Sequence, residues 1–131
     1  MNLQAANQAL KIRALMHQGT QINQARVEAW AATLDPDMPP NEARNLAIEW
    51  HKNNNGWMEP ADLNRLWRAL KRERLNSYLM PQPPAYIACN PNAYAEYEAE
   101  WRKQIIQGAT PGTAALTALA APKQIGGNHG Q

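Results

Sequence analysis

The chain has 131 residues, which suits one domain with a modest core and is too short for two large ones. Its 13 Lys and Arg against 11 Asp and Glu give a net charge of +2, so bulk charge alone does not make it a nucleic-acid binder. Cys89 is the only cysteine, which excludes a disulfide within the chain, and no stretch reaches the roughly 18 consecutive apolar residues of a membrane span. Since the N-terminus also lacks a signal-peptide pattern, we expect a soluble protein of the reducing cytoplasm.

Helical periodicity runs through most of the sequence, and the alternation typical of strands is nearly absent, which predicts an all-α fold. The first expected helix covers Leu3 to His17 and, being rich in glutamine and asparagine, is expected to contribute least to the core. A second runs from about Asn23 to Leu34, where Asp35-Pro36 ends it. A third begins at Pro40, because proline fits the first helical position, and it ends within the turn-forming HKNNNG.

The fourth expected helix follows an apolar loop contact at Trp57 and Met58, begins at Pro60 and continues to about Tyr78. Its apolar residues recur at helical spacing, as do those of the second and third helices. Residues 1–80 are therefore expected to form a four-helix bundle. Three tryptophans and five leucines make up its expected core: Trp30, Trp50, Trp67, Leu34, Leu46, Leu63, Leu66 and Leu70.

Beyond this bundle, the prolines of MPQPP disfavour helix in the residues before them, so residues 81–90 are expected to be a semi-rigid connector. Asn90 as a cap and Pro91 at the first helical position then predict a fifth helix, over residues 91–108. The residues after it are small and polar, with too little large apolar surface to offset the entropy of ordering. We expect residues 109–131 to be a disordered, flexible tail.

The sequence contains no pattern that predicts catalysis or metal binding. His17, His51 and His129 are scattered, and no two of them have the three- or four-residue spacing of a helical metal site. The phosphate-binding patterns G-x-x-x-x-G-K and G-x-G-x-x-G are absent as well. We therefore expect a non-enzymatic protein, without a metal or a cofactor, that acts through binding surfaces.

One candidate surface is the basic face of the fourth helix. At about 100° per residue, Arg65, Arg68 and Arg72 fall in a narrow stripe with Lys71 beside it, away from the apolar face. Two interpretations stay open. The stripe is either a solvated outer face paired with neighbouring acids, or a set of contacts for DNA phosphates or a partner protein.

A second candidate surface is an apolar stripe on the fifth helix, formed by Tyr94, Tyr97, Trp101 and Ile105 at three- and four-residue spacing. The stripe either docks back on the helical core of its own domain, since an isolated helix of roughly 15 residues is marginal in water, or enters the groove of a partner. In the second case Tyr97 and Trp101 would be the anchors.

The segment from Arg26 to Leu75 resembles small phage proteins of the loader-and-inhibitor family, which load or restrain a replicative helicase. The shared pattern is a helix with tryptophan and leucine, an acidic-proline turn into an alanine-rich helix, an apolar loop and a Pro-x-Asp-Leu helix start. The residues that carry it in this chain are Trp30, Leu34, Ala43, Ala47, Trp50, Pro60, Asp62 and Leu63.

This resemblance implies a helical N-terminal domain and a flexible C-terminal part, in a cytoplasmic protein of a bacterial host that binds a hexameric DnaB-type helicase. It further implies that the C-terminal part engages the helicase, and that a replicative helicase or an initiator protein is the partner. Two alternatives stay open: a DNA-binding replisome organiser or regulator that uses the basic face, and an inhibitor directed at another host protein. No membrane partner is expected.

Overall fold

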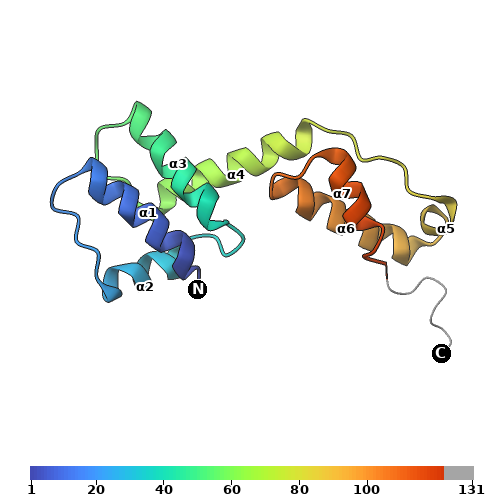
Figure 1. The fold of residues 1–131 in the computed structure, drawn as a ribbon, viewed down its shortest axis with the longest axis horizontal. Coiled ribbons are helices and arrows are strands. Elements are labelled where there is room, and N and C mark those ends of the chain that lie inside the picture. Colours follow the sequence, from blue (N-terminus) through green and yellow to red (C-terminus); the bar gives the residue numbers. More distant parts are fainter. Residues whose placement is uncertain (123–131) are drawn as a thin grey trace. The chain divides into compact units, whose positions relative to one another are not determined.

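The structure is a computed structural model that describes residues 1–122, and within them the chain is all-α, as predicted (Figure 1). Residues 123–131, with His129 and the last part of the expected tail, lie outside the described residues. None of the described helices is long and apolar enough to cross a membrane. In chain order the helices are α1 (Leu3–Met16), α2 (Gln24–Thr33), α3 (Pro40–Asn53), α4 (Pro60–Asn76), α5 (Ala85–Ala88), α6 (Pro91–Ile106) and α7 (Pro111–Ala118).

The chain divides into two units, and the division falls inside α4. The N-terminal unit is Met1–Leu70 and the C-terminal unit is Lys71–Gln131. The sequence predicted this boundary near residue 80 instead. The difference arises because the last turns of α4 pack with the residues that follow them. Leu75 lies against the C-terminal core, and Arg74 Nη1 donates a hydrogen bond to the carbonyl oxygen of Ile106 at 2.6 Å.

In the N-terminal unit, α1 is the central helix, because it packs against both α2 and α3 (Figure 1). It buries Ala5, Ala6 and Ala9 and, further along, Leu10 and Ile12. The expectation that this helix contributes least to the core is therefore wrong. Alanine side chains let neighbouring helices approach closely, so a helix that is poor in large apolar residues can still be packed on two sides.

Side chains from the loops set the starts of α1 and α2. Asn23 caps α2, since its Oδ1 accepts a hydrogen bond from the Arg26 backbone N–H at 2.8 Å. Asn2 caps α1, and its Nδ2 also donates to the carbonyl oxygens of Asp35 and Met38, both at 2.9 Å. The amide of Asn2 therefore ties the start of α1 to the loop between α2 and α3.

The predicted core of the N-terminal unit is mostly confirmed. Five of its predicted residues are buried, namely Trp30, Leu34, Leu46, Leu63 and Trp67. The other three are only half-buried, namely Trp50, Leu66 and Leu70. Met38, from the loop before α3, is also buried and was not predicted there. Its flexible thioether side chain suits the irregular space between the helices.

Two side chains of α4 attach this helix to the end of α2 and the loop after it. Asn64 is buried; its Nδ2 donates to the Thr33 carbonyl oxygen at 3.0 Å, and its Oδ1 accepts from the Asp35 backbone N–H at 2.9 Å. Trp67 Nε1 donates to Asp37 Oδ1 at 3.0 Å. Because buried polar groups need these partners, the bonds fix which face of α4 points inward.

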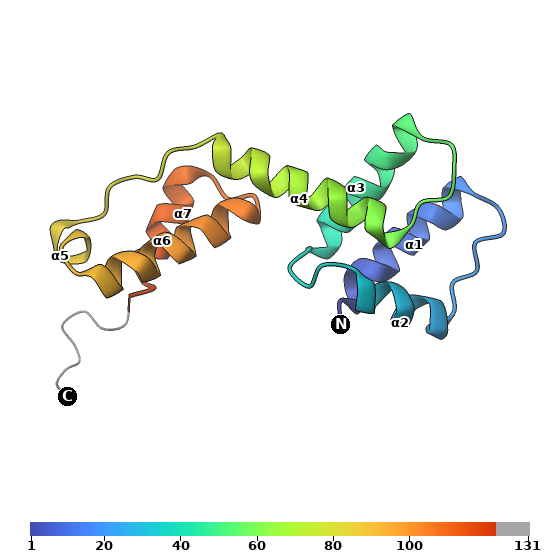
Figure 2. The same cartoon turned by 180° about the vertical axis from the view of Figure 1, so that it is seen from behind.

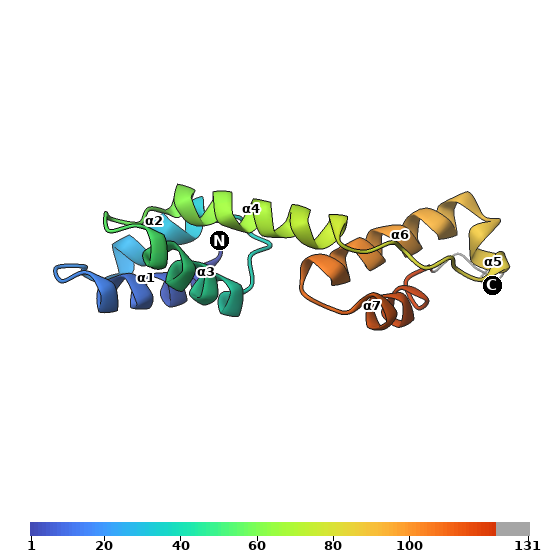
Figure 3. The same ribbon diagram turned by 90° about the horizontal axis from the view of Figure 1, so that it is seen from above.

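The C-terminal unit contains two helices that the sequence did not predict. The expected connector, residues 81–90, contains α5, and the expected tail, residues 109–131, contains α7. The Thr110 side chain caps α7, and the buried Ala114 and Ala118 place it beside α6 (Figure 3). The expectation of disorder is therefore corrected for residues 109–122. Alanines are sufficient here because α6 supplies the large apolar surface that the segment lacks.

The buried hydroxyl of Tyr97 should make the C-terminal unit sensitive to alkaline pH. Burial, with a smaller contribution from Tyr94, raises the pKa of Tyr97 above its usual value, and the hydroxyl donates to the Pro81 carbonyl oxygen at 3.2 Å. The unfolded chain releases this proton at a lower pH than the folded chain does. The free energy of unfolding should therefore be unaffected by this group well below pH ~10 and should fall as the pH rises through that value.

Chemical denaturation from about pH 9 to 11 measures this effect. A Tyr97→Phe variant should lose this contribution to the pH dependence, whereas Tyr86→Phe, which changes an exposed ring of the same unit, should retain it. Equal pH dependence in Tyr97→Phe and the parent chain would contradict the role given to this hydroxyl.

Candidate functional site

In the N-terminal unit, the predicted basic face is paired with the protein's own acids. Arg65 Nη2 lies 2.7 Å from Asp62 Oδ1 on the same helix. Arg68 makes two hydrogen bonds to the Asp35 carboxylate, at 2.9 and 2.7 Å, and this bonding raises the pKa of Arg68. Both arginines are exposed, so water screens the pairs. The structure thus favours, for these two residues, a solvated face with acidic partners.

The other two predicted basic residues belong to the C-terminal unit. Lys71 is half-buried and is not free, because it interacts with another group of the chain. Arg72 is exposed. Of the four residues, only Arg72 is therefore an exposed cation that no acid is seen to pair with in the part of the chain that the structure describes.

The predicted anchors on α6 lie inside the C-terminal unit. Tyr97, Trp101 and Ile105 are buried against α5 and α7, and Tyr94 is half-buried. The indole Nε1 of Trp101 donates to the Pro111 carbonyl oxygen at 3.3 Å. The stripe thus packs on α5 and α7, two helices that the sequence did not predict, and neither of the two interpretations named this partner. These side chains are not exposed to a partner in this conformation.

A third group of residues, which the sequence did not indicate, meets at one end of the N-terminal unit. Arg13 Cζ lies 4.7 Å from the centre of the Trp57 ring, and the His17 ring stacks on Trp57 at 4.9 Å with an interplanar angle of 20°. The His17 ring is 5.7 Å from that of His51, which meets Trp50 edge-on at 4.9 Å. We call these five residues the aromatic end.

Arg13 is the least usual member of the aromatic end, because its side chain is charged and only 8% exposed. It lies between Trp57 and Trp30, whose ring centre is 5.5 Å from Cζ. Glu59 Oε2 is 3.7 Å from Nη2, and Nε has no hydrogen-bond partner in the described structure. Burial lowers the pKa of Arg13; the charge of Glu59 opposes this effect, and that of Arg26 adds to it.

The sequence held only a weak signal for this cluster. Arg13 and His17 are four residues apart on α1 and so share one face of the helix. The partners of that face, Trp57 and His51, come from the α3–α4 loop and the end of α3, a distance along the chain that periodicity does not address. Two of the three histidines that looked scattered in the sequence, His17 and His51, are neighbours in the structure.

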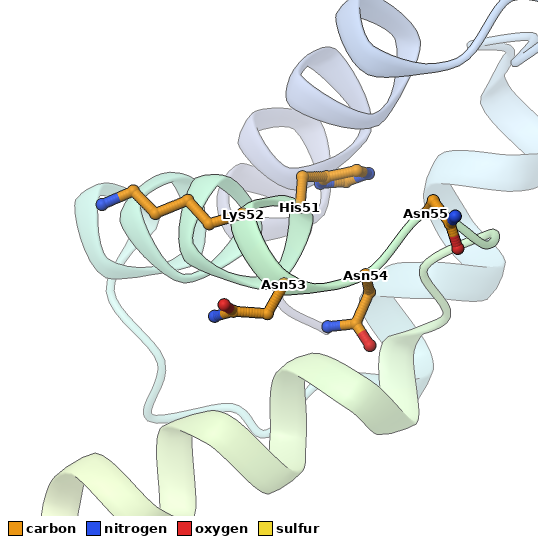
Figure 4. Close-up of a pocket in the computed structure, with 5 residues that line it drawn as sticks. All are labelled: His51, Lys52, Asn53, Asn54 and Asn55. Atoms are coloured by element: carbon orange, nitrogen blue, oxygen red, sulfur yellow. The ribbon is translucent and has the colours of Figure 1, made fainter.

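An open surface pocket of about 330 Å³ lies beside the aromatic end, at the end of α3, and is lined by His51–Asn55 (Figure 4). Some of its polar groups are used by the protein itself, although His51 Nε2 is buried without a hydrogen-bond partner in the described structure. Asn54 Nδ2 donates to the Trp50 carbonyl oxygen at 2.8 Å, and Lys52 lies 3.3 Å from Glu49. The His51 ring lies on the other side of the helix end from Asn53 and Asn54 (Figure 4). We therefore interpret this pocket as the capped end of α3.

Among the described residues, no group of three or more His, Cys, Asp or Glu side chains is arranged to hold a metal ion. The single thiol, Cys89, is exposed. Comparisons with protein-family models, with curated proteins and with solved structures found no match.

Proposed function

We propose that the chain is a non-enzymatic adaptor of phage DNA replication that binds a hexameric DnaB-type helicase and loads or restrains it. The observation that carries this proposal is where the resembling residues lie in the fold. Trp30, Leu34, Ala43, Ala47 and Leu63 are all buried in the N-terminal unit. The pattern shared with the loader-and-inhibitor proteins is therefore a pattern of helix packing, which is more specific to a fold than surface composition is.

A protein partner is favoured over direct DNA binding because the basic face is partly neutralised within the chain. Binding to DNA gains free energy when arginines replace the counterions of phosphates. Arg65 and Arg68 are paired with Asp62 and Asp35 and would have to exchange these carboxylates for phosphates. The gain from such an exchange is smaller than that from an unpaired arginine.

The test is to mix the purified full chain with the DnaB-type helicase of the bacterium in which the gene occurs. Size-exclusion chromatography with light scattering should show a complex heavier than the hexamer alone. A strand-displacement assay should show that the chain changes the rate of unwinding or of loading onto DNA. A hexamer of unchanged mass, with unchanged unwinding at micromolar chain, would contradict the proposal.

A salt titration tests the DNA-binding alternative. For direct binding through the basic face, the logarithm of the binding constant falls by about 0.9 per phosphate contact for each unit of log salt concentration. We expect a slope that corresponds to about one phosphate contact or less, for duplex and single-stranded oligonucleotides alike. A steep slope that Arg68→Gln reduces, and that Arg44→Gln on α3 leaves unchanged, would favour DNA binding instead.

A further inference from the structure

Trp57 is a half-exposed tryptophan whose ring is held by neighbouring side chains. Its side chain lies in the loop between α3 and α4 and is 49% exposed. The Arg13 guanidinium carbon lies 4.7 Å from the centre of its ring, and the His17 ring stacks on it at 4.9 Å. The orientation of the indole is therefore fixed before anything binds, and a partner would not have to supply the entropy of ordering it. Half-exposed, pre-ordered tryptophans are frequent hot spots of protein interfaces.

Other apolar groups are exposed at the end of α1 and in the loop that follows it. The loop after α1 and the loop between α3 and α4 lie together there (Figure 2). Met16, in the last turn of α1, and Ile22, in the loop after it, are both exposed. Between them in sequence, Gly19 has a φ of +92°, and a Cβ at that position would be 3.9 Å from the Trp57 ring. At 3.9 Å such a Cβ would make an ordinary contact, so it is the positive φ that favours glycine here.

Beneath Trp57, the charge of Arg13 is only partly compensated. The distance of 3.7 Å to Glu59 is longer than a hydrogen bond, and the Glu59 side chain is 61% exposed. The Nε atom of Arg13 has no partner in the described structure. A buried cation needs close, hydrogen-bonded anions to offset its desolvation, and this one has a single, distant carboxylate. A second carboxylate would be stabilised at this position.

We propose that the aromatic end binds an acidic amphipathic segment of a partner protein. Apolar side chains of the segment pack on Trp57 and on Met16, and one of its carboxylates replaces Glu59 on Arg13. This proposal goes beyond the helicase adaptor, because it concerns the chemistry of one surface and holds for any partner that carries such a segment.

The geometry favours a protein segment over a nucleic acid. A base stacks on the face of an aromatic ring, and on Trp57 that kind of contact is already made by His17, with Arg13 also close to the ring. The exposed Met16 and Ile22 have no use in phosphate binding, whereas they suit an apolar helix face.

The test uses the ¹⁵N-labelled full chain and follows the Trp57 indole N–H by NMR, with Trp57→Phe to assign the signal. The probes are a synthetic amphipathic helix with leucines on one face and glutamates on the other, its glutamine and lysine counterparts, and a single-stranded oligonucleotide. The glutamate peptide should shift the Trp57 signal and bind about tenfold more tightly than the glutamine peptide. The lysine peptide and the oligonucleotide should leave the signal in place.

Two variants assign the effect to Arg13. Arg13→Met keeps the volume of the side chain without its charge and should remove the preference for glutamate over glutamine. Glu59→Gln removes the internal competitor and should tighten binding of the glutamate peptide, which also tests the proposal if Arg13→Met does not fold. Leu3→Ser, at an exposed residue of the opposite end of α1, should change nothing.

Three results would overturn the proposal: no shift with any peptide, an equal or larger shift with the lysine peptide or the oligonucleotide, or weaker binding by Glu59→Gln. None of these measurements involves the helicase. Failure of the adaptor proposal and failure of this one are therefore separate results.

Discussion

Replacing Trp67 by alanine is expected to lower the free energy of unfolding of the N-terminal unit by about 3–5 kcal/mol. The indole is fully buried, and its Nε1 donates to Asp37 at 3.0 Å, so the variant loses both apolar burial and a hydrogen bond. Small domains unfold with about 5–15 kcal/mol in total. The loss is therefore expected to leave the N-terminal unit marginally folded at room temperature.

Urea denaturation followed by circular dichroism measures this change, and two further variants divide it into parts. Trp67→Phe keeps most of the ring volume and should cost less than the alanine variant. Leu15→Ala, at an exposed apolar residue of the same unit, should have a denaturation midpoint close to that of the parent. If Trp67→Ala unfolds at the parent's urea concentration, α4 is turned differently from what the structure shows.

Replacing Trp101 by alanine is expected to unfold the C-terminal unit and leave the N-terminal unit folded. The described core of this unit has only four large buried side chains, those of Ile87, Tyr97, Trp101 and Ile105, and is otherwise made of alanines. Loss of a buried tryptophan costs about 3–5 kcal/mol, and a unit this small has little stability to lose.

Amide hydrogen exchange measured by NMR can follow the two units separately in one sample. In Trp101→Ala, protection should be lost for the amides of α6 and α7 and retained for those of α1 and α3. Leu116→Ala, at an exposed side chain of α7, is the matched control and should keep protection in both units. Loss of protection throughout the chain would show that the two units fold as one.

The positions of the larger helices could be predicted because their ends are marked by local chemistry. Pro40, Pro60 and Pro91 each begin a helix at the predicted residue. Asn90 caps α6 as expected, with its Oδ1 accepting from the backbone N–H groups of Asn92 and Ala93. These signals act within one helical turn. A single sequence is therefore enough to show them.

The contribution of each helix to the packed core could not be predicted, because it depends on the helices against which that helix packs. α1 was expected to matter least and is central, since its alanines face α2 and α3. α7 was expected to be disordered and is ordered by the aromatic surface of α6. In both cases, the partner's shape compensates for small side chains, and composition within the segment does not report that shape.

The charged surfaces could be only half predicted for a similar reason. Spacing placed Arg65 and Arg68 on one face of a helix correctly, but the acid that pairs with Arg68 is Asp35, 33 residues away. Arg13, Trp57 and Glu59 are likewise brought together from distant parts of the chain. The residues of that cluster come from different elements, and no periodic pattern marks them in the sequence.

The central position of α1 has a consequence for the order in which the chain folds during synthesis. α1 ends at Met16, but α3, which covers its second side, is not complete until Asn53. At about 5–20 residues per second, the ribosome needs roughly 2–7 s to make the residues between them. During this interval the side of α1 that packs on α3 lacks its partner within the chain. A chaperone at the exit tunnel, or a partner protein bound early, would meet α1 before α3 does.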